Sequence, residues 1–147
     1  MQKPKLYLDM CCFNRPYDNQ QQERIYLESV AKLYVQKQIV QASLDFAWSF
    51  ILEYENSKNP YALRRQTIKT FSHRAAQYIS EDFAGEITPL AKSIMDEGIK
   101  AKDALHVACA VWAGCDFFLT TDDRLLKYNT SSIRVVNPMQ FVCEMEG

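Results

Sequence analysis

The sequence has no apolar run long enough to span a membrane or to form the core of a signal peptide, so we expect a cytoplasmic protein without a membrane partner. It also has no internal repeat, no linker and no low-complexity segment. Its 147 residues, 48% of them apolar and 24% charged, have the balance of an ordinary globular protein. We therefore predict a single domain over residues 1–147, large enough to bury a sizeable core.

The chain has no excess of positive charge, because its formal net charge is −1. Proteins that bind duplex nucleic acid over a wide surface are usually basic, so any contact with nucleic acid must be local. The five cysteines include no CxxC pairs at zinc-ribbon spacing, which argues against a zinc ribbon and favours reduced thiols in a cytoplasmic protein. The sequence also lacks a P-loop, a Rossmann glycine pattern and a G-x-S-x-G motif, so nothing indicates nucleotide binding or acyl transfer.

Short apolar segments alternate with segments of helical periodicity along most of the chain. Strands are predicted at 6–8, 39–42, 116–120 and 133–136. Helices are predicted at 19–37, 44–56 with Ser43 as N-cap, 60–78, 88–98, 101–113 and from 137 onward. This alternation favours an α/β fold, a three-layer α/β/α sandwich around a mainly parallel sheet of four to five strands.

Four acidic residues occupy related places in this pattern. Asp9 directly follows the first strand, and Asp122 comes just after the strand at 116–120. Asp103 lies in the first turn of the helix at 101–113, and Glu53 lies near the end of the helix at 44–56. Because ligands bind beyond the carboxyl ends of parallel strands, Asp9 and Asp122 are expected at one edge, with Asp103 pointing into the same crevice.

Carboxylates gathered in one place repel one another, which raises the pKa of each. A hard divalent cation relieves this repulsion by taking oxygen ligands from several carboxylates and leaving positions for water and phosphate. Such a metal polarises a phosphodiester, activates water and offsets charge on the leaving oxygen. The pattern therefore points to phosphoryl-transfer hydrolysis.

Four blocks of the sequence, taken in order, resemble a PIN domain, and the pattern is similar to the toxin ribonucleases of VapC type. The blocks lie at 6–9 (LYLD), 49–53 (SFILE), 102–108 (KDALHVA) and 116–122 (DFFLTTD). The resemblance implies a three-layer fold, a magnesium or manganese site, and cleavage of single-stranded RNA by metal-activated water. It also implies a homodimer and, for toxins, inhibition by a small antitoxin.

The resemblance further implies roles for individual residues. Asp9, Asp103 and Asp122 would hold the principal metal, while Glu53 would bind it through water or help to hold a second ion. Thr120 would position Asp122 by hydrogen bonding. Asp123 and Asn14 would support the site. The segment 10–16 departs from the family pattern because it lacks the small hydroxyl residues frequent in toxins, and Asn14 is the candidate for a polar contact there.

Each of these residues also has a plainer structural interpretation. An aspartate after a strand can cap a turn, as Asp9 does if it is not a ligand, and Asp103 can complement the dipole of its helix. Asp122 or Asp123 can cap a short helix that runs to 127. Glu53, with Glu55 nearby, can be an ordinary solvated glutamate at a helix end. His106, three residues after Asp103, fits a buried hydrogen-bonded histidine better than a general base.

One helix face carries basic residues at intervals of four: Arg65, Lys69 and His73. Residues four apart share a face, and this stripe is the best local candidate for a phosphate track along RNA. The alternative is an ordinary solvated helix face.

Two other classes of function remain open at this point. One is a PIN-fold module that binds RNA or protein without cutting, and the other is a metal-dependent phosphatase acting on small phosphate esters. A titration with manganese distinguishes the first class from a nuclease, because a module that does not cut RNA need not bind metal with all four acidic residues. Turnover of a phosphomonoester with indifference to RNA identifies the second.

Overall fold

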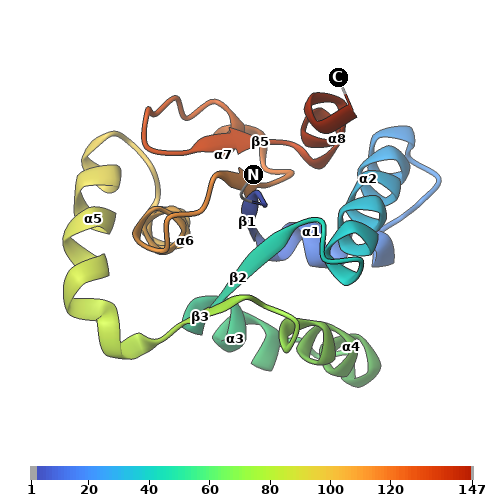
Figure 1. Ribbon diagram of the computed structural model, residues 1–147, viewed down its shortest axis with the longest axis horizontal. Coiled ribbons are helices and arrows are strands. Elements are labelled where there is room, and N and C mark those ends of the chain that lie inside the picture. Colours follow the sequence, from blue (N-terminus) through green and yellow to red (C-terminus); the bar gives the residue numbers. More distant parts are fainter. Residues whose placement is uncertain (1–2, 147) are drawn as a thin grey trace.

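The centre of the molecule is a sheet of five parallel strands in the order β3-β2-β1-β4-β5 (Figure 1). The computed structural model describes residues 3–146. The strands are β1 (Lys5–Leu8), β2 (Asp45–Ser49), β3 (Gln77–Ile79), β4 (Phe117–Leu119) and β5 (Arg134–Val136). The predicted α/β fold with a parallel sheet of four to five strands is confirmed.

Helices cover the sheet on both sides. They are α1 (Met10–Asn14), α2 (Glu23–Val40), α3 (Phe50–Ser57), α4 (Ala62–Ser72), α5 (Ala84–Asp96), α6 (Ala101–Trp112), α7 (Asp123–Leu126) and α8 (Pro138–Glu146). Two 3₁₀ turns, η1 (Arg15–Tyr17) and η2 (Glu81–Phe83), precede α2 and α5. In Figure 1, α5 and α6 lie together on one side of the strands, and α2 and α8 lie together on the other. Over residues 3–146, no helix is both long and apolar enough to cross a membrane.

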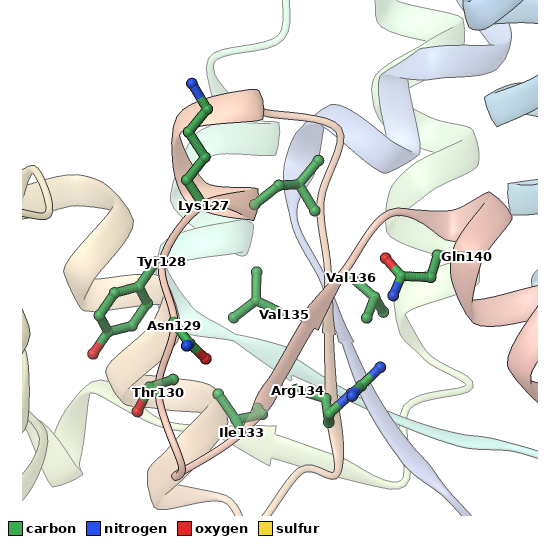
Figure 2. A pocket seen from close by; sticks show the side chains of 10 residues that line it. Lys127, Tyr128, Asn129, Thr130, Ile133, Arg134, Val135, Val136 and Gln140 are labelled. Atoms are coloured by element: carbon green, nitrogen blue, oxygen red, sulfur yellow. The ribbon is translucent and has the colours of Figure 1, made fainter.

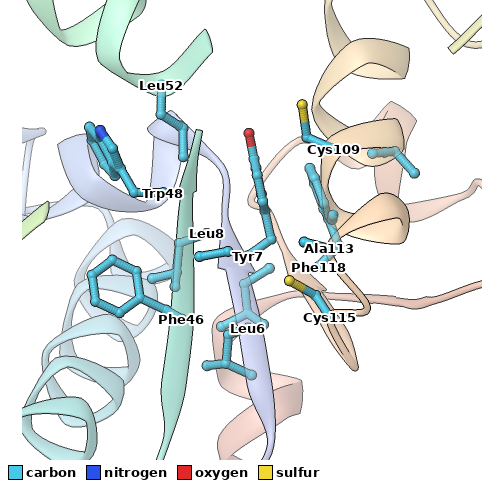
Figure 3. Close-up of a cluster of buried hydrophobic side chains, with 14 of the residues drawn as sticks. Leu6, Tyr7, Leu8, Phe46, Trp48, Leu52, Cys109, Ala113, Cys115 and Phe118 are labelled. Atoms are coloured by element: carbon cyan, nitrogen blue, oxygen red, sulfur yellow. The ribbon is translucent and has the colours of Figure 1, made fainter. Parts of the chain in front are cut away.

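β1 is the middle strand, and its side chains are almost completely buried. Leu6 pairs in register with Phe46 of β2 and Phe117 of β4. Leu6, Tyr7 and Leu8 are at most 1% exposed, and burial of such an apolar side chain contributes about 1.5–3 kcal/mol. Successive residues of a strand face opposite sides, and Figure 3 shows Tyr7 pointing toward Cys109 and Phe118. The core therefore fixes the strand that ends on Asp9.

The prediction for residues 39–56 is wrong in detail. The predicted strand at 39–42 is the last turn of α2 and the turn after it, where Ala42 adopts a left-handed conformation with φ of 63°. The first half of the predicted helix at 44–56 is β2, and the helix begins only at Phe50. Residues 46–48 are buried on both faces of the sheet. A continuous apolar run of this kind has the same appearance in a central strand and in a buried helix.

The start of α3 is set by Ser49 rather than by Ser43. The Ser49 hydroxyl accepts a hydrogen bond from the backbone N–H of Leu52 at 3.2 Å, which satisfies one of the free donors of the first turn. The predicted cap at Ser43 is therefore six residues too early. The true start of α3 matters for Glu53 and Glu55, because only one of these two glutamates can point toward the site at the carboxyl ends of the strands.

The predictions for the second half of the chain are closer. The predicted helix at 60–78 ends at Ser72, and its last part is β3. The helix predicted at 88–98 begins earlier, at Ala84, so that Pro89 lies inside it. The helix at 101–113, the strands at 116–120 and 133–136, and the terminal helix correspond to α6, β4, β5 and α8. Asp103 lies in α6, and Asp122 follows β4 as the N-cap of α7.

Candidate active site

Asp9 leaves the sheet at the carboxyl end of β1 and begins α1. Its Oδ1 accepts a hydrogen bond from the backbone N–H of Met10 at 2.9 Å, and its Oδ2 accepts one from the Thr120 hydroxyl at 3.0 Å. The side chain is 9% exposed. Asp9 thus both caps a helix and presents a nearly buried carboxylate whose orientation is held from two sides.

Thr120 connects the ends of β1 and β4. Its hydroxyl donates to Asp9 and accepts the backbone N–H of Asp122 at 3.1 Å. The residue is completely buried. The Cys11 thiol lies against the same pair, with Sγ 3.5 Å from the Thr120 hydroxyl and 3.6 Å from the Asp9 carboxylate. One hydroxyl therefore holds Asp9 and the backbone of Asp122 in a fixed relation.

Asp103 and Asp122 approach this edge from α6 and from the start of α7. Both line a cleft of about 170 Å³. Partial burial raises the pKa of Asp103, and the negative charges of Asp9 and Asp122 raise it further. Asp122 also accepts the backbone N–H of Arg124 at 2.9 Å, so it caps α7 as well. The three aspartates predicted from the sequence are thus close enough to repel one another.

These three carboxylates suit a hard divalent cation in their donor chemistry. Over residues 3–146, no three Asp, Glu, His or Cys side chains are already arranged as a ligand set. The residues fit such a cation in donor type, and Asp103 and Asp122 line the same cleft. Side-chain movement would have to complete the ligand set.

Replacement of Asp103 by Asn is expected to stabilise the metal-free protein at neutral pH. Because the folded-state pKa of Asp103 is raised, its ionised form weakens the fold, and this effect is present above that pKa. After discounting for solvent around a half-buried group, we expect about 0.5 kcal/mol and a rise of about 1–2 °C in Tm. Thermal unfolding in EDTA measures it. The gain should shrink as the pH falls through the raised pKa of Asp103, because the protonated side chain no longer carries the charge that weakens the fold. A gain that grows in acid contradicts the electrostatic explanation.

Glu53, the fourth acid predicted from the sequence, lies elsewhere. Its carboxylate accepts the indole N–H of Trp48 at 2.9 Å and pairs with Lys69 of α4 at 2.7 Å. The hydrogen bond from Lys69 is the main reason why the pKa of Glu53 is lowered. Glu53 lines a separate groove of about 490 Å³ with Tyr78 and other residues of α4 and β3. The structure does not bring Glu53 to the three aspartates.

Glu55 points instead toward α6, the helix that carries Asp103. Its carboxylate pairs with Lys102 at 2.7 Å and His106 at 2.9 Å, which lie on α6 on either side of Asp103. Glu55 raises the pKa of Lys102 most, and Asp103 and Asp9 add smaller contributions. Two residues apart on a helix means about 200° of rotation, so Glu53 and Glu55 point in nearly opposite directions. The signal that separates them is the Ser49 cap, which fixes where α3 begins.

A buried chain of hydrogen bonds holds Glu55. Ser49 Oγ lies 2.7 Å from the Tyr7 hydroxyl, which lies 2.6 Å from His106 Nδ1, and His106 Nε2 lies 2.9 Å from Glu55. Burial raises the pKa of Tyr7 well above its ordinary value, so its hydroxyl keeps its proton. Burial alone would raise the pKa of Glu55, but the hydrogen bond from His106 and the pair with Lys102 lower it.

An ionised Glu55 sets the direction of the hydrogen bond at one end of this chain. Because a carboxylate only accepts, His106 Nε2 donates to Glu55. At the other end Ser49 Oγ accepts the N–H of Leu52, and the Tyr7 hydroxyl lies within hydrogen-bond distance of both Ser49 Oγ and His106 Nδ1. Each of these polar atoms has a partner, so His106 acts here as a positioning residue for Glu55.

The two predicted supporting residues differ in their contacts. Asp123 is exposed and makes a bidentate pair with Arg24 of α2, at 2.7 Å and 3.1 Å. Asn14 ends α1, and within the described part of the chain its buried Oδ1 has no hydrogen-bond partner. Neither contact places these side chains among the aspartates.

The predicted basic stripe on α4 is largely engaged within the protein. Lys69 pairs with Glu53, and Arg65 donates to the backbone carbonyl of Asn59 at 2.6 Å. His73 ends the helix as its C-cap. Lys69 and His73 line the groove that contains Glu53, so these two residues of the stripe lie with Glu53 and not with the aspartates.

A further cavity of about 400 Å³ lies beside the edge strand β5 (Figure 2). It is formed by residues 126–130 and 133–136 with Gln140 of α8. None of its lining residues is acidic. It therefore lacks the chemistry of the aspartate cleft and is not the candidate site.

Comparison with known proteins relates the chain to others by its fold. No protein-family model matches the sequence, and no curated protein matches it. Among solved structures, a chain of the crystal structure of VapBC2 from Rickettsia felis bound to a DNA fragment from their promoter matches with a TM-score of 0.51 and 18% sequence identity. The match covers 90% of this chain and 98% of that one. The likeness shows that the two chains share the same overall fold.

Proposed function

We propose that this protein is a metal-dependent endoribonuclease that uses Mg²⁺ or Mn²⁺ to hydrolyse phosphodiester bonds of single-stranded RNA. The observation that carries the proposal is the placement of Asp9, Asp103 and Asp122 at the carboxyl ends of the parallel strands, where Asp103 and Asp122 line one cleft and Thr120 links Asp9 to the backbone of Asp122. Burial raises the pKa of Asp103, and the charges of Asp9 and Asp122 raise it further. An acidic cluster at this edge is where the fold places ligands. The likeness in fold to a chain of a VapBC complex supports the same class of protein.

In this proposal Asp9, Asp103 and Asp122 hold the metal, and Glu55 takes the place predicted for Glu53. A metal bound there supplies an activated water and offsets charge on the phosphate and the leaving oxygen. Thr120 orients Asp9 and the backbone of Asp122. The Tyr7–His106 chain orients Glu55 through hydrogen bonds rather than by contact with RNA.

The proposed partners are single-stranded RNA, a cognate antitoxin and a second copy of this chain in a homodimer. The antitoxin is proposed because the structural neighbour is a VapBC complex. With a net charge of −1, contact with RNA must be confined to a local surface. Arg65, Lys69 and His73 remain the proposed phosphate contacts, at the cost of opening the Lys69–Glu53 pair.

Incubation of the purified protein with fluorescent single-stranded RNA, with Mn²⁺ or with excess EDTA, tests this function. We expect cleavage with Mn²⁺ and a loss of at least ~10³-fold in EDTA, since metal stabilisation of the transition state amounts to several kcal/mol. RNA that is bound but uncut in the presence of Mn²⁺ identifies a binding module instead. Hydrolysis of p-nitrophenyl phosphate with no effect on RNA identifies a small-molecule phosphatase.

A further inference from the structure

Glu28 of α2 is a carboxylate with no exposed surface, and it is surrounded by donors from three parts of the chain. Its Oε1 accepts from Arg15 Nε at 2.8 Å, and its Oε2 accepts from Arg24 Nε at 3.1 Å and from the side-chain amide of Asn137. A buried carboxylate needs such partners, because leaving it unpaired is strongly destabilising. These contacts hold the guanidinium of Arg24 at its Nε atom.

The terminal nitrogens of Arg24, Nη1 and Nη2, bind the segment that contains Asp122. Arg24 Nη1 and Nη2 donate to the two carboxylate oxygens of Asp123, and Nη2 also donates to the backbone carbonyl of Thr121 at 3.2 Å. Asp122 lies between these two residues. A planar guanidinium that is held at Nε has little freedom left at its other nitrogens, so both neighbours of Asp122 are held by one rigid group.

The same segment is held from the opposite direction by Thr120, which accepts the N–H of Asp122. The Asp122 backbone is thus fixed between the end of β1, through Thr120 and Asp9, and helix α2, through Arg24 and Glu28. An exposed aspartate–arginine pair contributes little stability by itself. Its attachment to a fully buried carboxylate, directly beside the acidic cleft, indicates a positioning role.

We propose that Arg24, anchored by Glu28, is a positioning residue that holds the Thr121–Asp123 segment so that Asp122 is ready to bind the metal. This inference rests on the proposed function for the identity of Asp122 as a ligand. Its structural part, that Arg24 orders the segment before any metal is present, does not. Partners that orient metal ligands typically contribute 10–100-fold to metal affinity.

The test compares Arg24→Gln and Asp123→Asn with the wild type and with Arg134→Gln as a matched control. Arg134 Nη2 donates to both carboxylate oxygens of Glu144, at 2.7 Å and 2.8 Å, on the surface of β5 and α8. It is exposed to a similar degree, 57% against 48% for Arg24. Asp123→Asn guards against a folding defect, because Asp123 is exposed and its replacement leaves the Arg24–Glu28 pair intact.

The first measurement is amide hydrogen exchange in EDTA at Asp122 and Arg124, whose N–H groups donate to Thr120 and to the Asp122 carboxylate. Arg24→Gln and Asp123→Asn should each speed exchange about 10-fold at both amides, a local opening that the Arg134→Gln control does not share. Unchanged exchange in both variants overturns the inference, whatever the protein does with metal.

The second measurement is the Kd for Mn²⁺ alone by calorimetry. The two variants should bind Mn²⁺ about 10-fold more weakly than the wild type, and Arg134→Gln should bind it equally well. Faster exchange with unchanged Mn²⁺ affinity rejects the positioning role for Arg24. A wild type that binds no Mn²⁺ rejects the proposed function itself, and with it the metal part of the inference.

Discussion

Replacement of Asp9 by Asn is expected to abolish Mn²⁺-dependent cleavage of single-stranded RNA, with a fall of at least ~10³-fold, while the thermal unfolding midpoint stays level or rises. Asn keeps the shape and can still accept the N–H of Met10 at its oxygen, but its amide nitrogen cannot accept the Thr120 hydroxyl. The substitution removes the charge that a divalent cation needs. Removal of one of several repelling carboxylates should not weaken the metal-free fold. Cleavage rates and thermal unfolding, both on the same preparation, measure the two effects.

Asp116→Asn is the matched control for this variant. Asp116 lies before β4, at the opposite edge of the sheet from the cleft, and accepts the backbone N–H of Lys5 at 2.8 Å. Its replacement also removes one aspartate charge but should leave cleavage within about twofold, since a surface substitution is usually close to neutral. Equal activity of the Asp9→Asn and Asp116→Asn variants would show that Asp9 is not part of the active site.

Glu55→Gln is expected to lower cleavage about 100-fold, whereas Glu53→Gln should leave it within about threefold. Glu55 faces Lys102 and His106 beside Asp103, so its charge acts on the same cleft. Glu53 is turned toward Lys69, and the loss of a partly exposed pair of this kind contributes about 1 kcal/mol or less. Single-turnover cleavage rates at saturating Mn²⁺ separate the two positions.

The two glutamine variants control for one another, because they lie on the same helix and remove the same charge. Gln at position 55 can still accept the hydrogen bond from His106, so the buried chain from Ser49 to His106 keeps its acceptor. A strong loss in Glu53→Gln together with a mild one in Glu55→Gln would restore the original sequence-based assignment. Equal mild losses would leave the site with three acidic residues.

The positions of three acidic residues follow from the sequence because each is tied to an element that the pattern predicts well. Asp9 and Asp122 come directly after short buried strands, and parallel strands bring such ends to one edge. Asp103 lies in the first turn of α6, whose bounds were predicted to within a residue. Thr120, at the end of β4, is predicted only by the resemblance to a PIN domain.

The identity of the fourth acidic residue does not follow from the sequence, because it depends on how α3 is rotated about its axis and not only on where α3 lies. The apolar run at 44–52 contains the end of one strand and the start of one helix, and periodicity does not mark the boundary. When the helix is predicted to begin at Ser43, the sequence does not show which of Glu53 and Glu55 points toward the carboxyl ends of the strands. The neighbours in space, Lys69 for the first and His106 for the second, decide their directions.

The roles of Glu28 and Arg24 also cannot be predicted from the sequence pattern. On the sequence they form an ordinary pair four residues apart on a helix, typical of a solvated face. Their partners Arg15, Asp123 and Asn137 come from distant parts of the chain and meet only in the fold. Contacts of this kind depend on how α2 packs beside α8 and the end of β4, which local periodicity does not encode.

An anomalous difference map from crystals soaked in Mn²⁺ tests the central claim most directly. A cation that joins separate strands and helices at one edge should give a peak with carboxylate oxygens of Asp9, Asp103 and Asp122 within about 2.0–2.6 Å. Glu55 should be nearest among the glutamates. A well-diffracting crystal with no peak in this cleft, or with its peak beside Glu53 and Lys69, would contradict the account.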